Sequence, residues 1–154
     1  MIKKIFFISF IIIFISGCNY TPIYSKKDQN FKLGKIESSG NVKLNKVIIR
    51  NIKNLTKYNL NSSKIFNLKI ETNLKKEIKS KDTKGDPKTL EIKIVTNLIV
   101  NKDETNSLRK SFSYSSTYNA LDSEFELNKY EKTIIEKTLI SKISQKIIVY
   151  LQTL

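Results

Sequence analysis

Few side chains in this 154-residue sequence could carry out a reaction, and their types exclude the common catalytic sites. The chain has no histidine and a single cysteine, Cys18, so it cannot build a histidine-based triad, a His/Cys zinc site or an internal disulfide. The adjacent carboxylates Asp103 and Glu104 have no second acidic pair placed to share a proton with them. The four glycines form no phosphate-binding loop. The sequence therefore predicts that the protein is not an enzyme, and it leaves the Cys18 thiol and the lysine ammonium groups as its main chemistry.

The residues that precede Cys18 favour covalent lipid attachment. Two lysines come before an apolar run over residues 5–15, and the run leads into Ile15-Ser16-Gly17-Cys18. This ending resembles the bacterial lipobox, in which the thiol is diacylated and the cysteine becomes the new amino terminus after cleavage. We therefore predict a lipoprotein signal peptide over residues 1–17 and a diacylglycerol and N-acyl lipid on Cys18, with no other cofactor. The alternative is a free or buried thiol behind an ordinary signal peptide.

The apolar run is too short to span a membrane, so the predicted anchor is the lipid. Its eleven residues rise about 16 Å as a helix, roughly half the hydrocarbon core of a bilayer. Two or three acyl chains hold a protein on a membrane far more firmly than one chain does. An Asp after the cysteine is the inner-membrane retention signal of enteric bacteria, whereas this chain has Asn19. We expect a lipid-anchored protein on the periplasmic face of the outer membrane.

The net charge is strongly positive, but composition accounts for part of it. Lys and Arg number 28 against 14 Asp and Glu, and 26 of the 28 cations are Lys. Ile, Lys and Asn together supply 65 residues, which indicates a general preference for these three types. Removal of residues 1–17 would lower the formal charge from +14 to +12. Nucleic acid is excluded as a partner if the lipobox is used, because the mature protein would never share a compartment with the genome.

Residues 18–30 form a polar tether without a sustained period, and one folded domain over residues 31–154 should follow it. A short strand is expected over residues 31–38, and the polar residues 38–41 supply a loop and a helix N-cap. The next helix has its apolar side chains three or four residues apart; they are Leu44, Val47, Ile48, Ile52 and Leu55.

Three segments with a period of two then predict three consecutive strands. They cover residues 64–79, 90–101 and 107–120, with polar connections over 81–88 and 102–106. Consecutive strands of this kind predict an antiparallel meander. Their expected inward side chains include Leu74, and also Tyr114 and Tyr118, whose alternative reading is a ligand-stacking pair.

The last element should be the longest helix, because no Gly or Pro interrupts the chain between its cap and Leu154. Asp122 or Ser123 supplies the cap, and acidic residues follow where a helix amino terminus favours them. The stripe expected to cover the sheet consists of Ile135, Leu139, Ile143, Ile147, Tyr150 and Leu154, widened by Ile134, Ile140, Ile148 and Leu151. The predicted fold class is α+β, an antiparallel β-sheet in β-α-β-β-β-α order with two helices packed on one face.

This element order behind a lipobox resembles the lipopolysaccharide-assembly lipoprotein family, LptE. Its alphaproteobacterial members tend to begin Cys-Gly-aromatic-x-Pro-aliphatic-Tyr, and residues 18–24 here read Cys-Asn-Tyr-Thr-Pro-Ile-Tyr, departing from that pattern only at Asn19. A second similarity is the passage from Tyr114 through Tyr118-Asn119-Ala120 into a long carboxy-terminal helix that contains Tyr130-Glu131.

The resemblance implies a plug in the lumen of a large outer-membrane β-barrel, LptD, that assists lipopolysaccharide assembly and transport to the outer leaflet. Its partners would be LptD and lipopolysaccharide. A polar barrel lumen suits a domain that exposes many charged and amide side chains. The alternative is a lipoprotein adaptor of another envelope machine, such as a barrel-assembly or secretion accessory.

The best basic patch surrounds the predicted hairpin tip between residues 75 and 88, where six lysines exceed three acidic residues. The lysines are Lys75, Lys76, Lys79, Lys81, Lys84 and Lys88. They could contact lipopolysaccharide phosphates or acidic groups of a barrel wall through charge-assisted hydrogen bonds; the alternative is a solvated hairpin in a Lys-rich chain. Tyr20 and Tyr24 in the tether are candidates for interfacial or partner contacts.

Overall fold

A computed structural model describes residues 31–56, 62–102 and 106–154 of the chain. The predicted signal peptide, the lipidation site Cys18, the tether over residues 18–30 and the Asp103-Glu104 pair lie outside the described residues. The statements below concern the described part of the chain.

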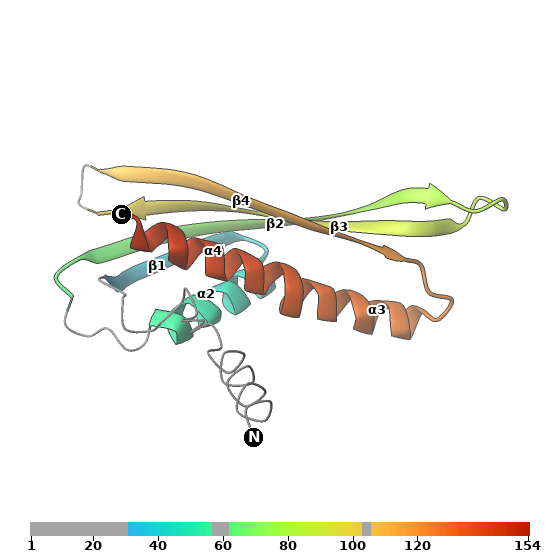
Figure 1. Cartoon of the computed structure of the whole chain (residues 1–154), viewed down its shortest axis with the longest axis horizontal. Coiled ribbons are helices and arrows are strands. Elements are labelled where there is room, and N and C mark those ends of the chain that lie inside the picture. The colour runs from blue at the N-terminus through green and yellow to red at the C-terminus, as the bar shows by residue number, and fades with distance from the viewer. Residues whose placement is uncertain (1–30, 57–61, 103–105) are drawn as a thin grey trace, which may run out of the picture.

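A four-stranded sheet with helices on one face forms the domain (Figure 1). The strands lie in the order β1-β2-β3-β4. The elements are β1 (Lys32–Gly40), α2 (Val42–Thr56), β2 (Ile65–Lys81), β3 (Pro87–Asn101), β4 (Ser107–Asn119), α3 (Glu124–Thr133), the π-helical segment η1 (Ile134–Ile140) and α4 (Ser141–Gln152). The predicted α+β class and the element order are confirmed.

The prediction that the whole sheet is antiparallel is wrong at one edge. The pairs β2–β3 and β3–β4 form the expected antiparallel meander, but β1 pairs parallel with β2. Helix α2 lies between these two strands in sequence and returns the chain to the starting end of β1. A helical crossover of this kind joins parallel neighbours, whereas a tight turn would have joined antiparallel ones.

The junction between β1 and α2 follows from one glycine and two asparagines, Gly40, Asn41 and Asn45. Gly40 has a φ of +80°, and a Cβ at this position would lie 2.6 Å from the backbone oxygen of Thr72. The Asn41 side chain then caps α2, because its Oδ1 accepts from the backbone N–H of Leu44 at 3.1 Å. The buried Asn45 side chain donates to the carbonyl oxygen of Ser39 at 2.6 Å. These contacts explain why the chain turns sharply from strand to helix here.

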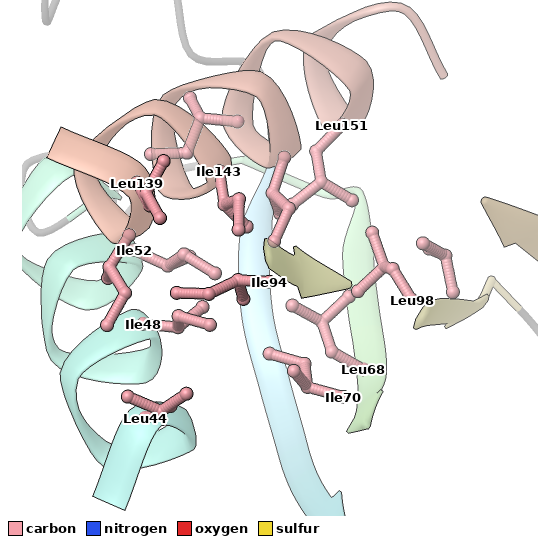
Figure 2. Packing of buried hydrophobic residues seen from close by; sticks show 14 of the residues in the cluster. Leu44, Ile48, Ile52, Leu68, Ile70, Ile94, Leu98, Leu139, Ile143 and Leu151 are labelled. Carbon is pink, nitrogen blue, oxygen red and sulfur yellow. The ribbon is translucent and has the colours of Figure 1, made fainter. Parts of the chain in front are cut away.

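The core lies between the sheet and the helices, as Figure 2 shows. Alternate residues of β2 and β3 are buried, including Leu68, Ile70, Ile94 and Leu98, and they face Ile48 and Ile52 of α2 and the carboxy-terminal helix. The predicted inward faces are confirmed for Phe66, Leu68, Ile70 and Thr72 of β2 and for Leu90, Ile92, Ile94, Thr96, Leu98 and Val100 of β3.

The carboxy-terminal helix is continuous over α3, η1 and α4, but its middle is π-helical. Ser123 is the N-cap, and its Oγ accepts from the backbone N–H of Glu126 at 3.4 Å. A π-turn places residues five apart above one another, so Ile134 is buried with Leu139, whereas Ile135 from the predicted stripe is half-buried. No helix among the described residues combines the length and apolar character that a membrane crossing requires.

The end of the sheet that contains the β2–β3 turn, here called the distal end, is less completely covered. It comprises β2 from Leu74, β3 up to Ile92, and α3, at the right of Figure 1. No residue of α3 is buried. The Leu74 side chain, predicted to point into the core, is 37% exposed, and Ile78 is 49% exposed. These side chains continue the inward alternation of β2 past the part of the sheet that the helices cover.

Candidate partner and lipid interface

The sheet face opposite the helices, here called the outer face, is almost entirely polar. The alternate residues of β2, β3 and β4 that point away from the core are mostly exposed. They include Asn67, Lys69, Glu71, Asn73, Lys93, Asn97, Ser111, Ser113, Ser115 and Thr117. Its apolar members are Val95 and Ile99, which are half-buried, and Ile65 at the start of β2, which is exposed. The surface offers amide and hydroxyl hydrogen bonds, so a partner on it would be polar.

Ion pairs on the outer face neutralise part of the lysine charge. Lys79 Nζ lies 2.7 Å from an oxygen of Glu91 and 3.4 Å from one of Glu77, which also pairs with Lys75. A hydrogen bond from Lys79, and a second one from Ser115, lower the pKa of Glu91. Lys75 is the first cause of the lowered pKa of Glu77. Exposed pairs of this kind contribute little to the stability of a fold. They do neutralise Lys75 and Lys79, so these two lysines are not uncompensated cations.

The structure divides the six lysines of the predicted basic patch into three groups. Lys75 and Lys79 belong to the outer-face ion pairs just described. Lys76 lies on the helix side of β2 and pairs with Glu131 of α3. Lys81, Lys84 and Lys88 surround the β2–β3 turn, and within the described residues these three have no ion-pair partner. Only this last group remains a cluster of exposed, uncompensated cations.

An open pocket of about 670 Å³ lies beside this turn at the distal end. Its apolar lining comes from Ile78, Pro87, Leu90, Leu121 and Leu127, which belong to the hairpin, the β4–α3 connection and α3. Asp86 also lines it, two residues from both Lys84 and Lys88 in the sequence. Its charged lining residues are Lys76, Glu77, Asp86 and Asp122, so the pocket combines an apolar surface with three carboxylates, and Lys81, Lys84 and Lys88 are not part of its lining.

One carboxylate joins the three elements around the distal end. Tyr118 Oη of β4 donates to Glu131 Oε1 of α3 at 2.6 Å, and Lys76 of β2 forms an ion pair with the same oxygen. Burial is the first cause of the raised pKa of the Tyr118 hydroxyl, and the Glu131 carboxylate adds to it. We call Lys76, Tyr118 and Glu131 the distal polar cluster. Sequence reasoning did not assign Glu131 a role, because its partners come from two different strands, β2 and β4.

Tyr114 and Tyr118 act in packing, as the core reading predicted. Tyr118 is 5% exposed and makes an edge contact with Tyr130, with ring centroids 5.9 Å apart. Tyr114 is half-buried against the core. Among the described residues, no group of His, Cys, Asp and Glu is assembled for a metal ion. Tyr20 and Tyr24 lie outside the described residues.

The fold is shared with several bacterial lipoproteins. No protein-family model matches the sequence, and no curated protein sequence matches it significantly. The rare lipoprotein B of Shewanella oneidensis is 12% identical, with a TM-score of 0.61 over 79% of this chain and 95% of that one. A minor lipoprotein of Acinetobacter baumannii is 8% identical, with a TM-score of 0.57 over 81% of this chain and 92% of that one.

A third structure agrees with these two. Lipoprotein B of Nitrosomonas europaea is 17% identical, with a TM-score of 0.55 over 77% of this chain and 80% of that chain. At such low identities, the likeness establishes a common fold. The high coverage of each neighbour means that the fold matches as a whole domain.

Proposed function

We propose that this chain is a lipid-anchored envelope protein that assists lipopolysaccharide assembly as the plug of a large β-barrel, LptD. In this proposal Cys18 carries the acyl chains, the domain lies on the periplasmic face of the outer membrane, and no step is catalytic. The common fold with lipoproteins from three other bacteria supports the anchoring part. The LptE resemblance of residues 18–24 and of the strand-to-helix passage supports the choice of partner.

The polar outer face is the observation that carries the barrel partnership. A folded domain inside a barrel lumen contacts polar walls, because the lumen-facing side chains of such barrels are polar. The outer face supplies amides, hydroxyls and charges of both signs over three long strands, with few apolar side chains. A surface of this composition can form many hydrogen bonds with a polar wall and exposes little apolar area before assembly.

The distal end supports direct contact with lipopolysaccharide. The uncompensated Lys81, Lys84 and Lys88 can bind phosphate groups through charge-assisted hydrogen bonds. The rival function is an adaptor of another envelope machine, for which the outer face would bind a different polar partner. Both functions require the same anchor and the same fold, so the identity of the partner distinguishes them.

Purification of the full-length protein from detergent-solubilised membranes tests the partnership. We expect a large β-barrel to co-purify and to migrate differently in cells depleted of this protein. Recovery of a soluble multiprotein complex without a barrel would favour the adaptor function. A variant with Ser111, Ser113 and Ser115 changed to Leu should lose the barrel, because apolar side chains replace hydrogen-bonding groups on the outer face.

The anchor is tested by the variant Cys18→Ala. Without the thiol, the chain should remain an uncleaved and non-acylated precursor, because the lipobox cysteine is both the acylation site and the new amino terminus. Labelling with a palmitate analogue and mass spectrometry of the amino-terminal peptide measure both properties. Normal labelling of the variant would contradict the assignment.

Lipopolysaccharide contact is tested by changing Lys81, Lys84 and Lys88 together to Glu. Binding should weaken more at low than at high salt, because exposed charges are screened by ions. The matched control changes Lys43, Lys46 and Lys53 to Glu, the same charge reversal on the exposed face of α2. Equal weakening in both variants would show that binding depends on net charge alone. The turn lysines would then be ordinary solvated surface residues.

A further inference from the structure

The two helices α2 and α4, which cover the core, expose charge of one sign. Neither helix contains an acidic residue. Their exposed cations are Lys43, Lys46, Arg50 and Lys53 of α2, three or four residues apart, and Lys142 and Lys146 of α4. Within the described residues, none of these six has an ion-pair partner. We call the exposed surface of α2 and α4 the helix face; its charged side chains are all cationic.

The lysine-rich composition does not explain this distribution. The acidic residues of the described chain lie on the strands, around the β2–β3 turn, in the β4–α3 connection and in α3 and η1. On the outer face, lysines and glutamates occur together and form ion pairs. A general excess of lysine would raise the charge of both faces, but it would not exclude acidic residues from one of them.

The cations of α2 are present against the local preferences of a helix. Lys46 and Arg50 are four residues apart, and Lys43 and Lys53 extend the row by three residues on either side. Like charges at these spacings repel one another and destabilise a helix. Lys43 also lies in the first turn, where the helix dipole disfavours positive charge. Local helix stability therefore does not account for the row, whereas an anionic surface outside the domain would relieve its repulsion.

A polar groove lies between the two helices, which pack side by side on the sheet (Figure 1). It is an open pocket of about 260 Å³, and its polar lining consists of Asn51, Asn54, Ser141, Ser144 and Gln145. The three amide side chains form no hydrogen bond within the described residues. The groove therefore offers free donors and acceptors beside the cations, so a partner on the helix face can combine hydrogen bonds with ion pairs.

The composition of the helix face fits an acidic protein surface better than a lipid bilayer. A helix that lies on a membrane directs an apolar face into the lipid. The apolar residues of α2 and α4 face the core instead, and apart from Val42 at the start of α2 they are buried or half-buried. Amides and cations without exposed apolar neighbours suit a wall that carries carboxylates and polar groups.

We propose that the helix face docks against an acidic stretch of the barrel wall, and that this contact sets the orientation of the plug. The inference rests on the proposed function, in which one copy fills the lumen of one barrel. A domain enclosed in a lumen faces the wall on every side, so the helix face requires a partner surface as the outer face does. The outer face, with charges of both signs, matches a mixed wall, whereas the helix face matches Asp and Glu. A plug rotated by half a turn would lose this match, because complementary charge selects one orientation.

Photocrosslinking in cells identifies what lies against the helix face. The photoreactive residue p-benzoylphenylalanine replaces Asn54, an exposed residue of the groove, and in a parallel full-length variant it replaces Ser113 on the outer face. We expect both positions to cross-link to the barrel, and mass spectrometry to place the Asn54 adduct in a peptide rich in Asp and Glu.

The other outcomes separate this inference from the proposed function. A barrel adduct from Ser113 alone, or an Asn54 adduct in a peptide without acidic residues, would overturn the inference and leave the plug function standing. An Asn54 adduct with a phospholipid or with lipopolysaccharide in place of protein would do the same. No barrel adduct from either position would contradict the proposed function itself.

Charge reversal tests whether the contact is electrostatic. When Lys46, Arg50 and Lys53 are changed together to Glu, carboxylates would face carboxylates, and the detergent-solubilised protein should recover at least about tenfold less barrel than the wild type. Changing the same three residues to Gln should cause a smaller loss. The matched control changes the exposed Lys129, Lys132 and Lys137 to Glu, which alters the net charge equally on α3 and η1, where charges of both signs occur. This control should retain the barrel.

A charge swap completes the test. Acidic residues of the cross-linked barrel peptide are changed to Lys, and capture by the variant with three Glu should return to within about twofold of the wild-type pair. All variants should keep the wild-type circular dichroism spectrum. Undiminished capture by the folded Glu variant, or an equal loss in the control, would overturn the inference, while recovery of the barrel by the wild type would still support the proposed function.

Discussion

The two ends of the sheet are held together by different forces. Around Ile94, strands β2 and β3 are covered by α2 and the carboxy-terminal helix, and burial of aliphatic side chains stabilises the fold. At the distal end, α3 contributes no fully buried residue; the distal polar cluster of Lys76, Tyr118 and Glu131 holds it to the strands, together with the ring contact of Tyr130 and the partly buried Leu127. Apolar side chains there, including Ile78, remain exposed.

This difference shows how one fold can combine a stable body with an adaptable end. Buried aliphatic contacts are numerous and cooperative, so the covered part of the sheet should open only with global unfolding. A small polar cluster can be broken locally at modest cost. The pocket, the uncompensated lysines and the exposed Phe125, 77% accessible, all belong to the distal end. The part of the molecule best suited to binding is therefore also the part least fixed by the core.

The largest expected effect contrasts two isoleucines. Ile94 is fully buried, and Ile94→Ala should lower the free energy of unfolding by about 2–5 kcal/mol. Ile78 is 49% exposed, and Ile78→Ala should change it by less than about 0.5 kcal/mol. Urea unfolding followed by circular dichroism measures both values. Similar losses in the two variants would show that the distal end is also part of the cooperative core.

Two glycines with positive φ provide the next comparison. In Gly40→Ala, left-handed backbone strain combines with a contact to the Thr72 carbonyl oxygen, and we expect a loss of about 2–3 kcal/mol. At Gly85, in the distal turn, no atom lies within 4 Å of an added Cβ, so Gly85→Ala should cost only about 1 kcal/mol of strain. Thermal unfolding of both variants checks the order. A larger loss of stability in Gly85→Ala than in Gly40→Ala would contradict the close packing of Gly40 against Thr72 at the β1–α2 junction.

Removal of the Glu131 charge should loosen the distal end selectively. Glu131→Gln weakens the contacts with Tyr118 and Lys76, and we expect it to cost about 1–2 kcal/mol. Hydrogen exchange should accelerate in α3 but not in α4. The control is Glu136→Gln on the same helix, because Glu136 has no ion-pair partner among the described residues. Unchanged exchange in α3 would mean that the distal polar cluster does not hold this helix.

The smallest expected effect is the pH dependence of the outer-face ion pairs. The folded-state pKa of Glu91 lies below its ordinary value of 4.5, chiefly because of Lys79. The stabilisation is therefore present above that value and is lost as the pH falls through the folded-state pKa. The urea midpoint of the wild type should fall between about pH 6 and about pH 3. The decrease should be smaller in Lys79→Met, and an equal decrease would exclude this pair as a contributor.

Local sequence patterns predicted much of the fold. The period of two in β2 and β3 and the spacing of three to four in α2 identified the inward faces, because each element exposes alternate sides at its own period. Ser123 was one of two proposed caps, and it is the one used. The exposure of Leu74 was not predictable in this way, since the alternation continues past the point where the helices cease to cover the sheet.

The candidate site was less accessible to sequence reasoning. The six lysines between residues 75 and 88 form one patch in the sequence, but adjacent residues of a strand point to opposite faces, so Lys75 and Lys76 acquire different partners. The role of Glu131 depends on Tyr118 and Lys76, which belong to separate strands. The same limitation applies to the pocket, whose lining comes from three segments of the chain.

The sequence by itself determined the order of the elements and most of their inward faces, and it predicts a lipobox before Cys18. These depend on residues that are neighbours in the chain, through backbone periodicity, capping and local motif chemistry, and the inward faces fail only where helix coverage or the π-helical turn changes, as at Leu74 and Ile135. Only the tertiary structure decided that β1 pairs parallel with β2, that the six patch lysines fall into three groups, and that β4 lies at an edge of the sheet. Each of these features depends on which elements lie side by side and on where the helices stop covering the sheet. Contacts between residues far apart in the chain determine both.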